Sequence, residues 1–333
     1  MPQLHKRAAV LLVVCTAIFP LTSLAAQLEG YAEYSVIFGD HVPESVARRV
    51  ARTTAWLDAL EKTTAALSSA RLVQWGAGEA QGRQALASAV FTPAMHSTRK
   101  GVHIFAHVRL SASQRTVEER LRKILHEREK LELLAEMLKL EREKAEEARG
   151  VIERPGMLRR GMRGLRVAEK ARVVQLADQL EALWLLRFLL PQREGGRWRD
   201  PQAALPVLQQ AAALDPDYAP LRQLFGEVLL QLDRPQDALV ELDKALTAHP
   251  ALASALYTRG LAYLRLQLPT LAERDFSAAL ARDDSHAAWW RARGALRMIR
   301  NEIGPMCDDF TQACALGDCE GLAVARERGE CIQ

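Results

Sequence analysis

Several signatures of enzyme active sites are missing from this sequence. It contains no Gly-rich phosphate loop, no Ser-centred nucleophile elbow, no HExxH motif and no paired CxxC motifs. Carboxylates are numerous, but they lie on charged helical faces, where contact with solvent is the ordinary state. We therefore expect a protein without catalytic activity, and without a bound cofactor or metal.

The sequence also has little excess of charge of either sign. Lys and Arg together exceed Asp and Glu by only four, an excess too small to indicate a nucleic-acid partner. The 333 residues, 49% apolar and 26% charged, have the composition of an ordinary globular protein with two or three domains.

Long hydrophobic runs are missing, except for one at the start of the chain. Positive residues at His5–Arg7 precede an apolar run from Ala8 to Leu24, and Ala25 and Ala26 suit a signal peptidase. A retained membrane anchor is the alternative, but Pro20 weakens the end of the run. We expect residues 1–26 to be removed and the mature protein to be soluble in an oxidising compartment, such as a bacterial periplasm.

Residues 27–112 predict a small α+β domain. Alternating patterns over Gly30–Phe38 and Gly101–Leu110 predict two strands, and apolar residues at three-and-four spacing from Val46 to Leu67 predict a helix between them. Three glycines between residues 76 and 82 predict a loop. The stretch from Glu29 into the Ala-rich helix is similar to amino-terminal domains of periplasmic flagellar-assembly and surface-lipoprotein families, which implies an association with the cell envelope.

Two histidines in this domain are candidate metal ligands. His103 and His107 share one face of the second predicted strand. About 13 Å of strand rise separates them, which is too far for one ion. We expect two solvent-facing histidines on a half-buried strand.

Residues 113–172 predict a charged helix followed by a basic joint. From Val117 to Ile152 the chain is rich in Glu, Lys, Arg and Leu, with a narrow apolar stripe. A self-pairing coiled coil and packing on neighbouring domains are both open interpretations. Pro155 and Gly156 end the helix, and the basic residues that follow could contact an anionic surface or form a solvated joint.

One pattern recurs three times from about Ala219 to Asp318, at a spacing of 34 residues, which we call the repeat period. Each copy has a glycine, then a small or flexible residue, a large apolar one and an alanine: Gly226, Ala238, Leu242, Ala245; Gly260, Ala272, Phe276, Ala279; Gly294, Met306, Phe310, Ala313. Glycine and alanine suit places where two helices approach closely. The pattern resembles the tetratricopeptide repeat, whose unit is two antiparallel helices. The third copy departs from it at Arg293 and Arg297, so we expect a weaker first helix there.

The resemblance implies a mainly α fold: an α-solenoid of helix pairs, preceded by the small α+β domain and the charged helix. Val174–Leu190 and Pro201–Leu214 resemble a degenerate first repeat with an enlarged loop. We therefore expect the array to span residues 173–331 and to end in a closing helix, Cys319–Arg328, that covers the last apolar face.

The first helix of each unit lines the concave surface in this family, which implies a partner-binding groove. The family's contact positions correspond here to Gln223, Glu227, Leu230, Gln231, Tyr257, Leu261, Leu264, Arg265, Arg291, Met298 and Ile299. Some of them could instead pack against the amino-terminal domain. The Lys/Asn clamp for a peptide's terminal carboxylate is missing, because other residue types occupy the matching places.

The resemblance therefore favours an exported scaffold that holds a protein or peptide partner. The alternative is a structural component of an envelope assembly, such as a flagellar, secretion or cell-wall complex, held through the amino-terminal domain.

Four of the five cysteines lie within the last 27 residues. Cys307 and Cys314, seven residues apart, share one helix face, and a closing helix that runs back antiparallel brings Cys319 near Cys314 and Cys331 near Cys307. We therefore predict the nested disulfides Cys307–Cys331 and Cys314–Cys319, although four cysteines allow three pairings. A zinc site is the alternative, which the lack of paired CxxC spacing disfavours.

Overall fold

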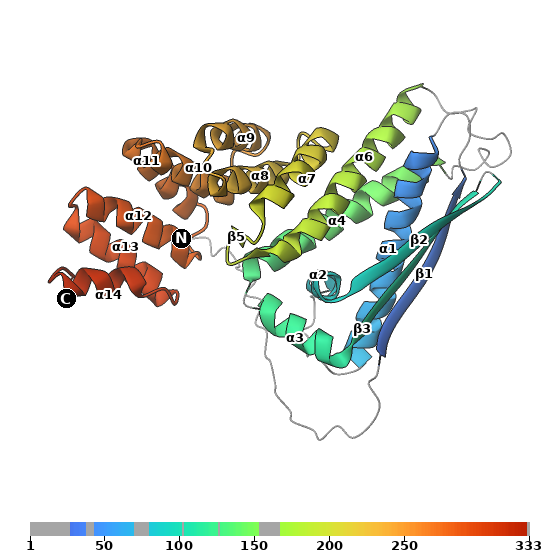
Figure 1. Cartoon of the computed structure of the whole chain (residues 1–333), viewed down its shortest axis with the longest axis horizontal. Coiled ribbons are helices and arrows are strands. Elements are labelled where there is room, and N and C mark those ends of the chain that lie inside the picture. Colours follow the sequence, from blue (N-terminus) through green and yellow to red (C-terminus); the bar gives the residue numbers. More distant parts are fainter. Residues whose placement is uncertain are drawn as a thin grey trace, which may run out of the picture. The chain divides into compact units, whose positions relative to one another are not determined.

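The computed structural model describes residues 27–37, 43–69, 80–101, 103–125, 127–152 and 167–331. The predicted signal segment at 1–26 and most of the predicted basic joint lie outside these residues. The chain divides into two compact units, one up to Pro191 and one from Gln192 onward. Each unit is described by itself (Figure 1).

The first unit contains a three-stranded antiparallel sheet in the order β1-β3-β2. The strands are β1 (Gln27–Ile37), β2 (Thr92–Lys100) and β3 (His103–Ser113), with β3 in the middle. Burial alternates along β3 as the sequence predicted: Ile104, Val108 and Leu110 are fully buried, while Arg109 is exposed. The buried face packs against α1 (Glu44–Ser69), which lies along the sheet (Figure 1).

Further helices of this unit include α2 (Ala80–Val90), α4 (Arg128–Ile152) and α6 (Val167–Leu189). Trp56 of α1 is fully buried and meets Trp184 of α6 edge to face, with ring centroids 5.8 Å apart. Arg187 lies over the Trp56 ring and donates to Glu141 of α4 at 2.7 Å. This buried ion pair and the tryptophan pair join α1, α4 and α6 into one core.

The structure corrects three sequence predictions in this unit. Helix α2 and strand β2 occupy a stretch that was expected to begin as a loop, because Gly82 and Pro93 obscure the periodicity. The single charged helix is two helices, α3 (Gln114–Leu125) and α4. The apolar stripe of α4, with Met137 and Ala148 fully buried, is covered within the unit, where α4 packs on α2 and α6. Packing rather than self-pairing accounts for that stripe.

No helix in the described ranges combines the length and the apolar character needed to cross a membrane.

The second unit is a series of helix pairs that follows a short hairpin. A 3₁₀ turn, η2 (Leu190–Gln192), lies at the division between the units, followed by β4 (Arg193–Glu194) and β5 (Arg197–Trp198). The helices are α7 (Pro201–Leu214), α8 (Ala219–Gln231), α9 (Pro235–Ala248), α10 (Ala253–Arg265), α11 (Pro269–Leu280), α12 (Ala287–Ile299), α13 (Ile303–Ala315) and α14 (Glu320–Glu327). The predicted pairs are α8/α9, α10/α11 and α12/α13, and α14 closes the array.

The turn within each pair has the same backbone geometry. Asp233, Gln267 and Asn301, each one repeat period after the last, all adopt a positive φ between 56° and 60°. In the first pair, the Arg234 amide donates to the Leu229 carbonyl at 2.9 Å and the Asp233 amide to the Leu230 carbonyl at 3.2 Å. These two bonds form a Schellman motif, which satisfies the last carbonyls of the first helix and reverses the chain.

The array begins later than the sequence predicted. Helix α6 packs on α1 and α4 in the first unit, so the boundary at residue 173 is corrected to the division after Pro191. Helix α7 does keep the repeat register, because Ala204, Leu208 and Ala211 are fully buried one repeat period before their counterparts in α9. The β4–β5 hairpin stands where the enlarged loop between the two helices of that unit was expected.

Close approach between the helices of each pair depends on the repeated glycine. A Cβ built on Gly260 would lie 2.5 Å from the Phe276 ring, and one built on Gly226 would lie 2.7 Å from Leu242. Phe310 is enclosed from two sides, since a Cβ on either Gly294 or Gly321 would lie within 2.7 Å of its ring. The large apolar residue thus packs directly on a glycine backbone of the facing helix.

We expect Gly260→Ala to lower the free energy of unfolding by about 1–3 kcal/mol, because the rigid, buried Phe276 ring has no room for an added methyl group. Denaturant unfolding of the full chain measures the effect. Gly304→Ala is the matched control: a Cβ built there meets nothing within 4 Å in the described part of the chain, so the unfolding free energy should stay unchanged or rise by up to about 1 kcal/mol. Equal effects of the two substitutions would contradict this packing argument.

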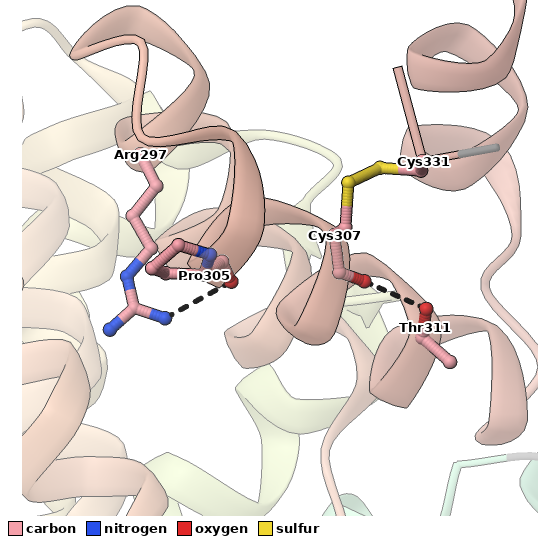
Figure 2. The surroundings of a disulfide bond; sticks show 5 residues. All are labelled: Arg297, Pro305, Cys307, Thr311 and Cys331. Atoms are coloured by element: carbon pink, nitrogen blue, oxygen red, sulfur yellow. Dashed lines mark hydrogen bonds between the residues drawn. A yellow bond between two sulfur atoms is a disulfide. The ribbon is translucent and has the colours of Figure 1, made fainter. Parts of the chain in front are cut away.

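Both predicted disulfides are present at the end of the array. Cys307 and Cys331 have Cα atoms 5.4 Å apart, and Cys314 and Cys319 have Cα atoms 4.0 Å apart. Figure 2 shows the Cys307–Cys331 bond, which joins the first turn of α13 to the segment after α14. The bonds hold α14 where only two of its side chains, Leu322 and Ala325, are buried.

The outer disulfide should contribute more stability than the inner one. We expect Cys307→Ser/Cys331→Ser to lower the unfolding free energy by about 3 kcal/mol and Cys314→Ser/Cys319→Ser by about 2 kcal/mol, because the outer bond closes the longer loop. Denaturant titration of both variants without reductant checks the ranking. A reversed order would show that loop closure does not govern the effect.

Candidate partner-binding groove

The predicted groove residues lie on the first helices of the three pairs, α8, α10 and α12. Helices α8 and α10 lie side by side within the array. Corresponding positions on successive first helices differ by one repeat period, so that Gln231, Arg265 and Ile299 form one row near the carboxyl ends of the three helices. We call these three residues the terminal row.

On α8, two of the predicted groove residues, Glu227 and Gln231, are engaged by the hairpin of the same unit. Gln223 is buried and donates to Glu227 at 2.7 Å. Arg193 donates from Nε and Nη2 to the two carboxylate oxygens of Glu227, each at 2.8 Å. The side-chain amide of Gln231 accepts from the Trp198 backbone amide at 2.8 Å and donates to its carbonyl at 2.9 Å. The first third of the groove is therefore occupied within the chain.

On α10, the predicted residues mostly join the core between the second and third pairs. Tyr257 stacks on Trp289 of α12 with ring centroids 5.4 Å apart. Leu261 and Leu264 are partly buried against the cluster that contains Phe276. These side chains shape the groove floor and hold α10 and α12 together.

Two members of the terminal row remain open to solvent. The Arg265 side chain is 62% exposed, and its Nη1 lies 3.5 Å from the carboxylate of Asp233, itself 85% exposed. Ile299 is 79% exposed. An exposed pair of this kind contributes little to stability, so both side chains can contact a partner with little loss to the fold.

On α12, two predicted groove residues have structural contacts instead. Arg291 lies 3.2 Å from the Asp318 carboxylate and 2.7 Å from that of Glu320, so it ties α12 to the start of α14. Met298 packs on the last core cluster, which contains Met306 and Phe310. Both residues therefore contact the last part of the array, where α14 covers the final helix pair.

A repeated charge pair between helices was missed from the sequence. Arg259 bonds both carboxylate oxygens of Asp275 at 2.6 and 3.1 Å, and Arg293 does the same to Asp309 at 3.0 and 2.8 Å. The second pair follows the first by one repeat period. The repeated Arg-Gly at the start of the pattern and the repeated Asp-Phe were the signal that could have revealed it.

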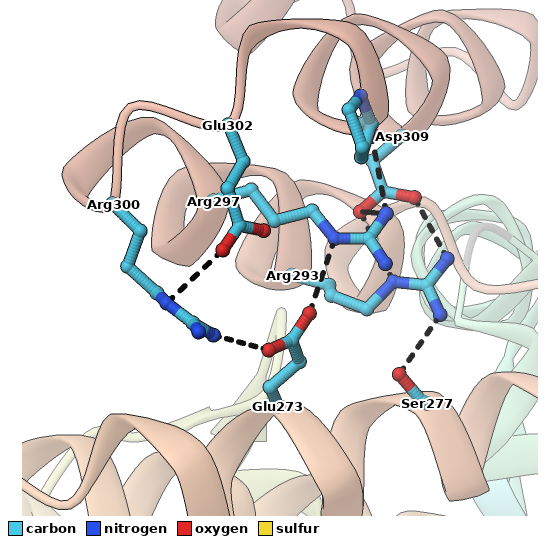
Figure 3. A network of polar contacts seen from close by, with 8 residues as sticks. Glu273, Ser277, Arg293, Arg297, Arg300, Glu302 and Asp309 are labelled. Atoms are coloured by element: carbon cyan, nitrogen blue, oxygen red, sulfur yellow. Dashed lines mark hydrogen bonds and ion pairs between the residues drawn. The ribbon is translucent and has the colours of Figure 1, made fainter.

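The sequence had suggested that Arg293 and Arg297 weaken the third copy. Because both belong to this set of charge pairs, they do not. Both donate to Asp309, whose side chain is only 1% exposed, with Arg297 Nη1 at 2.9 Å. Figure 3 shows how Glu273 extends this network, pairing with Arg297 at 3.4 Å and with Arg300. The network joins α11, α12 and α13, which belong to neighbouring pairs.

Hydrogen bonds to carboxylates change the pKa of Arg259 in the first of these pairs. Burial lowers the pKa of Arg259, but hydrogen bonds to Asp275 and Asp243 outweigh that effect and raise the pKa above its ordinary value. At the turn before α12, burial raises the pKa of Asp283, yet bonds from Ser285 and the neighbouring His286 leave it below its ordinary value. His286 in turn stacks on Trp289 at 4.2 Å.

Asp309→Asn should lower the unfolding free energy by about 3–5 kcal/mol, because two partly buried guanidinium groups would lose their shared, buried carboxylate. The neighbouring Asp308 is exposed, so Asp308→Asn should change it by less than about 0.5 kcal/mol. Thermal and denaturant unfolding of both variants give the comparison. Similar values for the two would mean that the Asp309 network is dispensable.

The two histidines of β3 have acidic and aromatic neighbours in the first unit. His107 lies 3.3 Å from a Glu33 carboxylate oxygen and stacks on His96 at 4.5 Å. His103 lies beside Phe105, with centroids 6.0 Å apart. Across the described ranges, no group of three or more His, Cys, Asp or Glu side chains is arranged to hold a metal ion.

Comparison with known proteins identifies the repeat. Residues 199–260 match the family model of the tetratricopeptide repeat. The match begins just after the hairpin and includes α7, the α8/α9 pair and most of α10. No curated protein matches the chain.

Solved tetratricopeptide structures give partial likenesses. PilF of Pseudomonas aeruginosa is 18% identical with a TM-score of 0.40, covering 56% of this chain and 86% of that one. MamA of Desulfovibrio magneticus RS-1 is 21% identical with a TM-score of 0.36, covering 53% and 97%. YrrB, described as a TPR protein with an unusual peptide-binding site, is 15% identical with a TM-score of 0.36, covering 59% and 88%.

Proposed function

We propose that this chain is an exported scaffold that binds a protein or peptide partner on the concave face of its tetratricopeptide array. The terminal row carries the proposal. Its first member is engaged by the hairpin, whereas Arg265 and Ile299 extend into solvent at corresponding positions of the next two pairs. Tetratricopeptide arrays bind through extended concave surfaces built from such repeated positions.

The chemistry of the row suggests the chemistry of the partner. Arg265 offers a largely solvated guanidinium group, and Ile299 offers an exposed apolar side chain. A complementary segment would bring a carboxylate to Arg265 and an apolar side chain to Ile299. We therefore propose a partner segment with acidic and apolar side chains, held across α10 and α12.

Export to an oxidising compartment, such as a periplasm, is part of the proposal. The apolar run that precedes Gln27 has the composition of a cleaved signal peptide. Two disulfides at the end of the array support the same compartment, because such bonds persist where thiols are not kept reduced. Mass spectrometry of the protein from its native cells should find Gln27 as the first residue. An intact segment 1–26 would contradict cleavage.

Arg265→Glu should reduce partner retention at least about fivefold, equivalent to about 1 kcal/mol, because the reversed charge repels an acidic segment. The melting temperature should change little, since Arg265 is mostly solvated. Retention of crosslinked partners from native envelope extracts by the full mature chain gives the measurement.

Arg274→Glu is the matched control, because Arg274 lies on the second helix α11 with a side chain that is 66% exposed. It should retain partners as the unmodified chain does. An equal loss of partner retention in both variants would show that the change in net charge alone causes the effect. Partners unaffected by Arg265→Glu but captured by residues 27–191 alone would favour the alternative of an envelope component held through the first unit.

A further inference from the structure

The β4–β5 hairpin lies on α8 in the manner of a bound peptide. Gln231 satisfies both backbone groups of Trp198 with one side-chain amide, at 2.8 and 2.9 Å. Such an arrangement recognises the main chain of an extended segment and places no demand on its sequence. Sequence preference comes from Arg193, which Glu227 bonds through both carboxylate oxygens.

Burial shows that this contact is extensive for so short a segment. Trp198 is only 3% exposed, and the side chains of Arg193 and Glu227 are 8% and 14% exposed. The rest of the hairpin is open: Glu194, Gly195, Gly196 and Arg197 are all exposed. The hairpin is thus anchored to α8 by one basic and one aromatic residue, five positions apart.

One polar group in the contact between the hairpin and α8 lacks a hydrogen-bond partner. The indole N–H of Trp198 is buried and has no hydrogen-bond partner among the described residues. A buried donor without a partner costs free energy that a solvated one does not. The hairpin is held by its tether to the array as well as by its contacts, because a short connection to α7 gives it a high effective concentration at α8.

We propose that Glu227 and Gln231 form a clamp for a segment that turns as this hairpin does, with Arg and Trp as cross-strand partners, and that the hairpin is its displaceable in-chain occupant. The inference rests on the proposed function, since it assigns the first third of the same concave face. It adds that a segment of this composition competes with the hairpin, whereas partners held at Arg265 and Ile299 do not need the clamp.

The test uses a fluorescein-labelled nine-residue peptide with the sequence of residues 192–200, QREGGRWRD, and the full mature chain. The Arg193→Ala/Trp198→Ala variant, called the vacated variant, lacks the two side chains that anchor the hairpin and should bind the peptide at least tenfold more tightly than the unmodified chain does. Adding Glu227→Ala/Gln231→Ala should abolish that gain. Arg197→Ala is the matched control, because Arg197 is exposed on the same hairpin; it should behave as the unmodified chain.

Two results would overturn the clamp. One is a vacated variant that melts cooperatively but gains no peptide affinity; the other is a gain that survives Glu227→Ala/Gln231→Ala. If the vacated variant does not fold, hydrogen exchange in the unmodified chain decides. Gln231 holds the Trp198 amide, so excess peptide should accelerate exchange there, and unchanged exchange would show that the hairpin is not displaced. Because the probe is a synthetic peptide, this outcome is independent of whether native partners need Arg265.

Discussion

The array depends on one steric constraint, the contact of a large apolar side chain with a glycine backbone. Gly260 leaves room for Phe276, and Gly226 does the same for Leu242, at distances where a methyl group would overlap the neighbouring side chain. This contact sets how closely the two helices of a pair approach. Since the Schellman turn after each first helix is also repeated, each pair has nearly the same geometry, and pairs of equal geometry stack into a solenoid.

Charge pairs between helices restrict how the helices of the array are oriented, which non-directional apolar contacts do not. Each second helix carries a buried carboxylate at the same register position, Glu241, Asp275 or Asp309. Arg259 bonds the carboxylate of its own pair and that of Asp243 in the preceding helix, and Arg293 likewise reaches Ser277. A buried carboxylate tolerates little displacement of its arginine, because an unpaired buried charge is costly. The buried carboxylates therefore fix the two helices of a pair against each other, and the bonds of Arg259 to Asp243 and of Arg293 to Ser277 link each pair to the preceding one.

Sequence reasoning succeeded where a contact repeats and failed where it occurs once. The glycine positions follow from the spacing, the helix pairs from the family resemblance, and the disulfide pairing from a closing helix that runs back antiparallel. The boundary at residue 173 was wrong because the apolar face of α6 packs on Trp56 and α4. An apolar stripe in a sequence predicts a buried face, but it does not indicate which element covers that face. Groove positions came from the resemblance, which could not foresee that Arg193 would engage Glu227 or that Asp318 would engage Arg291. The first contact involves a hairpin without a repeat period, and the second joins the last helix pair to the segment that precedes α14.

The hairpin gives the groove a direction. A regular array would present the same position on every first helix, and a partner could bind in several registers. Here Gln231 is occupied by Trp198, Arg265 is a solvated cation and Ile299 is apolar. A segment bound along the row as proposed would therefore meet a closed end, a charge and an apolar contact in fixed order. In the proposed function, specificity then arises from differences between repeats, while the fold arises from what the repeats share.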